Sequence, residues 1–243
     1  MLIVNADDLG RLPATTDSIL ACYAKRRITS TSAMVFMRDS ERAAGLALAS
    51  GIDLGLHINF SERFTGDSVP TPLREGHDRI CRFLTANKYA LLVYHPFLRR
   101  QFRLVFEAQY AEFKRLYGRE PSHLDGHQHM HLASNMLFDH LLPEGTKVRR
   151  SFSFRSGEKS PVNRFYRAAV DRRLARRHRL TDYFFALAQH PDLDRLGRVI
   201  QLAKEAKVEL MTHPAVQKEY DFLMSDEYGQ AVAAVRMAGY DAL

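Results

Sequence analysis

Short apolar runs alternate with longer amphipathic segments along this chain. The short runs are typical of buried strands, which we expect at residues 2–5, 28–36, 53–58, 147–150 and 208–212, with a further short strand entered at His123. The longer segments carry apolar residues every three or four positions and predict helices at residues 16–25, 39–49, 99–117, 134–142, 164–177 and 196–206. Strands that alternate with helices indicate βαβ units and a parallel sheet.

The number and length of these elements fit an α/β fold. We expect a distorted, TIM-like (β/α) barrel with seven parallel strands rather than eight, formed by a single domain over residues 1–243. The polar stretch that contains Pro70 and Pro72 is predicted as a loop. In such barrels the catalytic groups gather at the carboxyl ends of the strands, so the polar residues that follow each strand are the first candidates for function.

Composition places the chain among soluble globular proteins, with 46% hydrophobic and 26% charged residues. Cys22 and Cys81 form no CxxC pair, so we expect two buried, reduced thiols rather than a zinc ribbon or a redox motif. No basic region precedes the first apolar run, and no stretch approaches the roughly 20 apolar residues that span a bilayer. We therefore expect a cytoplasmic protein without a transmembrane segment.

The net charge of +7 is concentrated in a basic block over residues 149–179. Its cations are Arg149, Arg150, Arg155, Lys159, Arg164, Arg167, Arg172, Arg173, Arg176, Arg177 and Arg179. Such a block can bind nucleic acid or an anionic surface, but no nucleic-acid-binding motif accompanies it, so we expect a solvated surface helix over residues 164–179 and no nucleic-acid partner. The buried stripe of this helix is predicted at Phe165, Ala168, Ala169 and Leu174.

Four polar clusters follow predicted strands. They are Asp7-Asp8, His57, the histidine-rich segment 123–131, and His213. The adjacent carboxylates of Asp7 and Asp8 repel one another unless a positive charge lies nearby, and a divalent cation would supply it. A helix N-cap is the alternative for this pair. His57 alone is more typical of a satisfied core histidine, and only the other clusters change that interpretation.

The histidine-rich segment holds four of the eleven histidines within nine residues. Neutral imidazole is the commonest nitrogen ligand for divalent metals, so this density favours a metal site. Because side chains alternate along an extended segment, His127, His129 and His131 are not equivalent. The roles of Asp125, His129 and His131 stay open at this point.

His213 ends the last predicted strand and precedes Pro214. The proline restricts the backbone of His213 to an extended or turn conformation. Such a position suits an imidazole that is held over a site as a general acid, and a surface turn histidine is the alternative.

Taken in order, these residues resemble the YdjC-like carbohydrate deacetylases, the group that contains chitooligosaccharide deacetylase and the hopanoid-associated deacetylase. The matching segments cover residues 4–10, 28–32, 55–57, 123–129 and 211–214. Each motif alone is weak, but the ordered set covers nearly the whole chain. The resemblance implies a distorted (β/α) barrel, a divalent metal, and removal of the acetyl group from an N-acetylated sugar or glycolipid.

The resemblance also implies roles for particular residues. By position it assigns the metal ligands Asp8, His57 and His127. It makes Asp7 the catalytic base and His213 the C-terminal site histidine, and it places either Arg149 or Arg150 at a basic position after the fifth strand. One carboxylate suits Mg²⁺ or Zn²⁺, while two histidines lean toward Zn²⁺, so the identity of the single divalent ion stays open.

The chemistry of amide hydrolysis is consistent with these roles. Asp7 can take the proton of the attacking water, and His213 can protonate the leaving amine. Asp125 can hold His57 or His127 from behind. A metal-dependent phosphoesterase or amidohydrolase-like barrel is the alternative, with the basic block binding phosphate. A nucleic-acid-binding protein is the alternative from another class, and a homodimer is compatible with each of these functions.

Overall fold

The computed structural model describes residues 1–154, 157–187 and 192–243. Its sheet has six parallel strands in the order β4-β3-β2-β1-β6-β5. The strands are β1 (Leu2–Leu9), β2 (Ser30–Ala33), β3 (Asp53–Ile58), β4 (Leu124–Gly126), β5 (Tyr183–Ala186) and β6 (Val208–Thr212). The sheet is an open half-barrel, so the prediction of a TIM-like α/β barrel holds in outline but the expected seven strands were wrong.

The strand count differs at the open side of the half-barrel. The expected strand at residues 147–150 contributes only isolated bridges, from Val148 to Leu124 and from Lys147 to Arg179. Strand β5 was missed, although its sequence Tyr-Phe-Phe-Ala is rich in the aromatic residues that strands favour. The segment after β4 therefore runs beside that strand without extending the sheet, and β4 and β5 remain the two edges.

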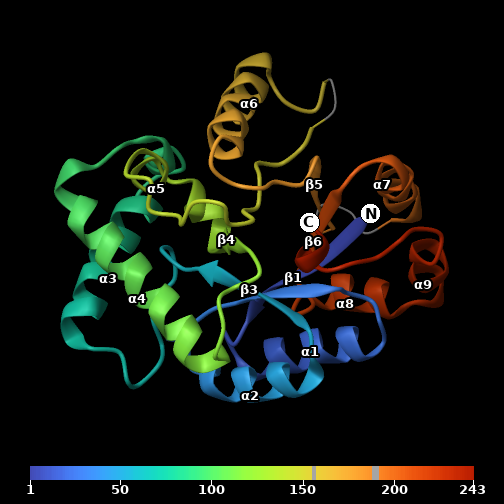
Figure 1. The fold of residues 1–243 in the computed structure, drawn as a ribbon, viewed down its shortest axis with the longest axis horizontal. Coiled ribbons are helices and arrows are strands. Elements are labelled where there is room, and N and C mark those ends of the chain that lie inside the picture. Colours follow the sequence, from blue (N-terminus) through green and yellow to red (C-terminus); the bar gives the residue numbers. More distant parts are fainter. Residues whose placement is uncertain (155–156, 188–191) are drawn as a thin grey trace.

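Helices cover the outside of the sheet (Figure 1). The α-helices are α1 (Pro13–Ala24), α2 (Ser40–Ser50), α3 (Thr71–Thr85), α4 (Arg99–Tyr117), α5 (Ser134–Phe138), α6 (Pro161–Ala175), α7 (Leu193–Glu205), α8 (Gln217–Met224) and α9 (Asp226–Val232). Short 3₁₀ helices lie at η1 (Ala90–Leu92), η2 (Pro96–Leu98), η3 (His127–Leu132) and η4 (Tyr240–Ala242). The periodicity correctly predicted α4, whose apolar stripe, including Phe102, Val105 and Phe113, is buried.

Helix α3 corrects the prediction of a loop around Pro70 and Pro72. Pro72 lies in the first turn of α3, where the missing N–H of proline costs nothing because no intrahelical acceptor exists for it. Leu73, Ile80 and Leu84 then recur at helical spacing and are buried. The two prolines thus mark the start of a helix rather than an interruption.

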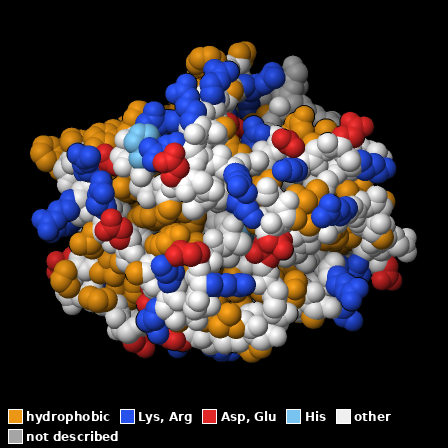
Figure 2. Space-filling view, viewed as in Figure 1, with side chains coloured by type: hydrophobic (Ala, Val, Ile, Leu, Met, Phe, Trp, Pro, Cys, Tyr) orange, Lys and Arg blue, Asp and Glu red, His pale blue; other side chains and the backbone are white. Residues whose placement is uncertain are grey.

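Helix α6 is the surface helix expected from the basic block, and it projects from the body of the molecule (Figure 1). Basic and apolar side chains lie side by side at this end (Figure 2). The predicted buried stripe is confirmed only at Leu174, because the buried residues of α6, which are Val170, Asp171 and Leu174, lie in its C-terminal half. Exposed instead are Phe165, Ala168 and Ala169. Arg155 of the basic block lies outside the described residues.

The hydrophobic core lies between the sheet and its covering helices. Cys22 and Cys81 are free and buried, as the sequence predicts. Among the described residues, no helix has the length and apolar character needed to cross a membrane.

Candidate metal and catalytic site

A bulge in β1 places two adjacent carboxylates on one side of the strand. Ala6 pairs with Thr31 and Leu9 pairs with Ala33, so two β1 residues lie opposite one residue of β2. Asp8 takes a left-handed backbone conformation with φ of 75°, which is rare for a residue other than glycine. Adjacent strand residues ordinarily point to opposite faces, and the bulge removes that alternation. Asp7 and Asp8 are both buried, so neither is an exposed helix cap.

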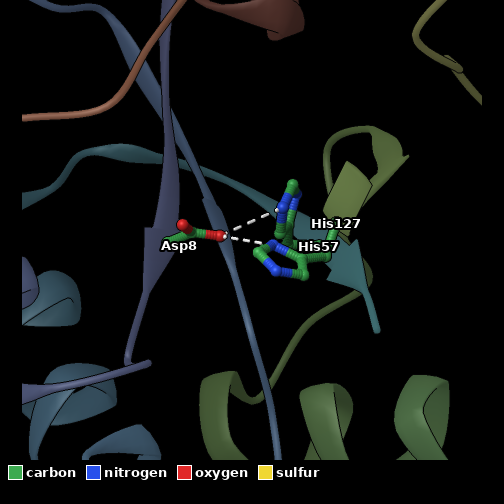
Figure 3. Close-up of side chains that lie close together, drawn as sticks. All are labelled: Asp8, His57 and His127. Carbon is green, nitrogen blue, oxygen red and sulfur yellow. Dashed lines mark hydrogen bonds and ion pairs between the residues drawn. The ribbon is translucent and has the colours of Figure 1, made fainter. Parts of the chain in front are cut away.

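Asp8, His57 and His127 come from three strand ends and point toward one another (Figure 3). Asp8 Oδ1 lies 3.3 Å from His57 Nε2 and 3.0 Å from His127 Nδ1. One nitrogen or oxygen atom of each side chain lies within 4.8 Å of the others, a separation that a single metal ion can bridge. Burial raises the pKa of Asp8, but hydrogen bonds from His127 and His57 outweigh it, and the net pKa is lowered.

Asp125 at the end of β4 holds the ring of His57 from behind. Its Oδ1 lies 2.8 Å from His57 Nδ1, and its Oδ2 accepts a hydrogen bond from Ser32 at 2.7 Å. With Nδ1 directed to Asp125, His57 presents Nε2 toward Asp8. Burial lowers the pKa of His57, but Asp125 and Asp7 reverse this effect and raise it to about 10. The carboxylates around His57 therefore form a site that attracts positive charge.

Arg149 is fully buried and binds the carboxylates beneath the site. Its Nη1 and Nη2 donate to the two oxygens of Asp7, each at 2.7 Å, and Nη2 also lies 2.8 Å from Asp125. Its Nε donates to Glu209 of β6 at 2.7 Å. Arg150 points away and pairs with Asp171 of α6 at 2.8 Å. The structure thus resolves the ambiguity between the two arginines, and Arg149 faces the site.

His213 follows β6 at the rim of the same site and is partly exposed. Its N–H donates to Glu219 of α8 at 2.9 Å, and its ring Nδ1 lies 3.7 Å from the other Glu219 oxygen. Burial lowers the pKa of His213, but Glu219, Asp7 and Asp8 outweigh burial and raise it. The ring is therefore fixed near the carboxylates in a setting that favours its protonated form.

The other histidines of the cluster turn away from the candidate metal ligands. His131 Nε2 bonds the backbone oxygen of Arg149 at 3.0 Å. His129 has a left-handed φ of 60°, and its ring packs edge-on against Phe152. His123 fills the space that Gly55 leaves in β3, since a Cβ at Gly55 would lie 2.3 Å from the His123 ring. One histidine of the four, His127, thus reaches Asp8.

Sequence reasoning missed Glu62, Glu209 and Glu219, although each contacts a candidate site residue. Glu62 Oε2 lies 3.3 Å from His127 Nε2 and 2.9 Å from Arg11 Nε. No motif identified these acids, because each reaches the site only through the path of the folded chain. Glu209 alone left a signal in the sequence, as the single charged residue within the apolar β6.

Comparisons with known proteins agree with this architecture. Residues 1–234 match the family described as YdjC-like protein. A carbohydrate deacetylase of Mus musculus is 35% identical over 140 residues, which cover 54% of this chain and 43% of the mouse protein. A chitooligosaccharide deacetylase of Serratia marcescens is 28% identical over 233 residues, covering 88% of this chain and 81% of that protein. The matched region therefore spans less than half of the mouse relative.

A solved structure from Enterococcus faecalis V583, described as a candidate cellobiose-phosphate cleavage protein, superimposes with a TM-score of 0.70. It is 18% identical, and the superposition covers 99% of this chain and 97% of the other, so it supports the fold alone. The family match, in contrast, extends over nearly all of the sequence. The chain therefore belongs to the YdjC-like protein family.

Proposed function

We propose that this protein is a metal-dependent hydrolase that removes the N-acetyl group from an N-acetylated sugar or glycoconjugate. The observation that carries the proposal is the convergence of Asp8, His57 and His127 beside Asp7, which Arg149 binds at both oxygens. The relatives named carbohydrate deacetylase and chitooligosaccharide deacetylase support the substrate class. A glycolipid substrate is a narrower form of the same proposal.

The donor set fits one divalent ion. Asp8, His57 and His127 would hold it, and one carboxylate with two imidazoles leaves positions open for substrate and water, as a catalytic site requires. The carboxylates that raise the pKa of His57 would also attract a cation, which supports the proposal. Mg²⁺ and Zn²⁺ both suit the donors, and the two histidines favour Zn²⁺. When bound, the ion would polarise the acetyl carbonyl and lower the pKa of water.

Asp7 is proposed as the general base, and its hydrogen bonds identify the reactive atom. A carboxylate oxygen has two lone pairs. Oδ1 uses both, since it accepts from Asn5 at 3.0 Å and from Arg149 at 2.7 Å. Among the described residues, Oδ2 accepts only from Arg149, and it lies 3.9 Å from His57 Nε2. Oδ2 therefore retains one lone pair, directly beside the ligand set, to take the proton of the attacking water.

His213 is proposed as the general acid. Its Nδ1 faces Glu219, which leaves Nε2 available for the leaving nitrogen. The raised pKa of His213 favours the protonated imidazole, the form that a proton donor requires. When the carbon–nitrogen bond breaks, the water oxygen stays with the acetyl group as acetate and the sugar nitrogen takes the proton of His213 as the free amine.

Two arginines of the basic block are engaged elsewhere, so the alternative phosphoesterase would have to bind phosphate through other cations of the block. Arg149 is already bound by Asp7, Asp125 and Glu209, and Arg150 is paired with Asp171. Within the described residues, neither arginine is thus free to bind a phosphate. The nucleic-acid-binding alternative remains untested and would show as salt-sensitive binding that is unaffected by a chelator.

Acetate release tests the proposal. The metal-free protein and the protein reloaded with Zn²⁺ or Mg²⁺ are assayed on N-acetylated chitooligosaccharides, nucleotide sugars and glycolipids, and on p-nitrophenyl phosphate in parallel. We expect metal-dependent release of acetate from at least one N-acetylated sugar, and its loss in Asp7→Asn. Phosphate release without acetate release by the metal-loaded protein would contradict the proposal.

Three broader expectations accompany the function. We propose that residues 1–243 form a single domain, that the protein acts in the cytoplasm, and that it can assemble as a homodimer. Limited proteolysis, cell fractionation and analytical ultracentrifugation test these points separately.

A further inference from the structure

Two buried residues beneath Arg149 have no role in the proposed mechanism. Glu209 is the second residue of β6, and Tyr240 begins η4 near the end of the described chain. Both side chains are fully buried. The Tyr240 ring stacks on His123, with ring centroids 3.7 Å apart and an angle of 10° between the planes. The residue thus lies within the polar network under the site rather than on the surface.

Tyr240 is held in place from several directions. Its N–H donates to Asp53 of β3 at 2.6 Å, and its carbonyl oxygen accepts from Lys147. Just before it, the N–H of Ala238 donates to the carbonyl of Leu2 in β1 at 3.1 Å. The segment therefore closes the end of the half-barrel opposite the catalytic residues and carries the Tyr240 ring inward.

Glu209 binds the end of Arg149 that faces away from the catalytic base. The two terminal nitrogens of Arg149, Nη1 and Nη2, bind Asp7 and Asp125, while Nε donates to Glu209 Oε1. Contacts on two sides of a planar guanidinium fix both its position and its rotation. Without the contact at Nε, the guanidinium of Arg149 could rotate. Its hydrogen bonds to Asp7 would then change, and Oδ2 of Asp7 would no longer be positioned to accept a proton.

The remaining atoms of this network lie next to each other. Glu209 Oε2 and the Tyr240 hydroxyl are buried, and among the described residues neither has a hydrogen bond of good geometry. Burial and the Glu209 carboxylate raise the pKa of Tyr240, which indicates that the two side chains lie close together. Burial raises the pKa of Glu209 to about 7, and Arg149 and Tyr240 oppose that rise. Since buried polar groups are stable when they are paired, we expect the hydroxyl of Tyr240 to serve as the partner of Glu209 Oε2.

We propose that Glu209 and Tyr240 are positioning residues, which hold Arg149 and through it keep Asp7 in the reactive orientation. The inference rests on the proposed role of Asp7 as the base. The family match ends at residue 234, so Tyr240 lies outside the matched residues. Tyr240 supports Glu209, Glu209 fixes Arg149, and Arg149 orients Asp7.

The test compares two buried tyrosines by removing one hydroxyl from each. Tyr240→Phe removes the hydroxyl that we expect to pair with Glu209. Tyr228→Phe is the matched control, since Tyr228 is fully buried but its hydroxyl donates to the backbone of Arg27, outside the network. Steady-state kinetics and metal content are measured for both zinc-loaded variants, together with Glu209→Gln and Glu209→Ala.

We expect Tyr240→Phe to lower kcat roughly 3- to 10-fold with unchanged KM and metal content, while Tyr228→Phe keeps the kcat of the wild type. Loss of Glu209 should cost more, and Glu209→Gln should retain more kcat than Glu209→Ala because its amide oxygen can still accept from Arg149. Equal kcat in Tyr240→Phe and Tyr228→Phe, with only the melting temperature lowered, would overturn the proposal.

A second readout separates this proposal from the enzymatic one. The Nε–H signal of Arg149, assigned in a ¹⁵N spectrum by its loss in Arg149→Lys, reports the contact with Glu209 whether or not the protein releases acetate. We expect its hydrogen exchange to accelerate at least 10-fold in Tyr240→Phe and to be unchanged in Tyr228→Phe. An unchanged exchange rate in both variants would refute the positioning role, whereas an inactive protein with accelerated exchange would refute only the proposed function.

Discussion

Replacing Arg149 by methionine should destabilise the protein severely, and the structure indicates by how much. The change leaves Asp7, Asp125 and Glu209 buried around an uncharged side chain. Removing one partner of a buried ion pair costs about 3–5 kcal/mol in free energy of unfolding. For a chain of this size, each kcal/mol lowers the melting temperature by about 2–4 °C. We therefore expect Arg149→Met to melt about 6–20 °C below the wild type at pH 8.

The pH dependence gives this prediction its sign. In the wild type, burial raises the pKa of Asp125, but Arg149 and His57 outweigh burial and the net pKa is lowered. The stability that Asp125 contributes is therefore present at neutral pH and is lost as the pH falls. In Arg149→Met the desolvated carboxyl groups have raised pKa values, so their penalty is present at pH 8 and disappears on acidification. The difference in stability between the two proteins should therefore shrink between pH 8 and pH 5.

Urea unfolding of the metal-free proteins at pH 8, 6.5 and 5 measures this difference. Adding Glu209→Gln to Arg149→Met should recover part of the loss, because one of the three unpaired carboxylates is removed. If Arg149→Met does not fold at pH 8, its free energy of unfolding at pH 5 can still be compared with that of the wild type. Arg149→Lys, which should have intermediate stability, can be compared at each pH. Stability within about 1 kcal/mol of the wild type at pH 8, or a gap that widens on acidification, would refute the reasoning.

Four other changes test the site separately. His127→Ala should abolish binding of the divalent ion, and full metal occupancy by elemental analysis would remove His127 from the ligand set. Asp7→Asn should keep the ion but lower kcat roughly 10²- to 10⁴-fold, so near-normal turnover would place the base elsewhere. His213→Ala should lower kcat at unchanged metal content, most strongly for substrates with poor leaving groups, whereas loss of metal would make His213 a ligand. Reversing the charges of Arg172 in α6 and Arg176 at its C-cap, both exposed, should leave kcat intact, and a large loss would mean that this helix contacts substrate.

Alternating hydrophobicity predicted the parallel α/β architecture, and the position of polar residues at strand ends was enough to locate Asp7, Asp8 and His57. The choice between Arg149 and Arg150 was beyond the sequence, because a slip of one residue along an extended segment reverses which side chain faces inward. The structure resolves it through the pairing of Arg150 with Asp171.

Other errors arose where tertiary contacts override local pattern. The apolar residues at the start of α6 indicated a buried stripe, but this half of the helix projects beyond the core and leaves Phe165 exposed. Glu209 was missed in the sequence, because only the folded chain brings Arg149 to it. Helical or strand periodicity records which residues can share a face, but not what packs against that face.

The bulge in β1 ties the proposed base and a proposed metal ligand to one peptide bond. Consecutive Cα atoms are about 3.80 Å apart whatever the sheet does, so thermal motion of the half-barrel changes the spacing of Asp7 and Asp8 very little. His127, in contrast, follows the edge strand β4, which pairs with the sheet on one side through β3. Motion of β4 would alter how tightly an ion is held, while the position of the proposed base Asp7 stays fixed. A change at the edge strand would therefore alter ion affinity with little effect on proton transfer, whereas a change at the bulge would alter both.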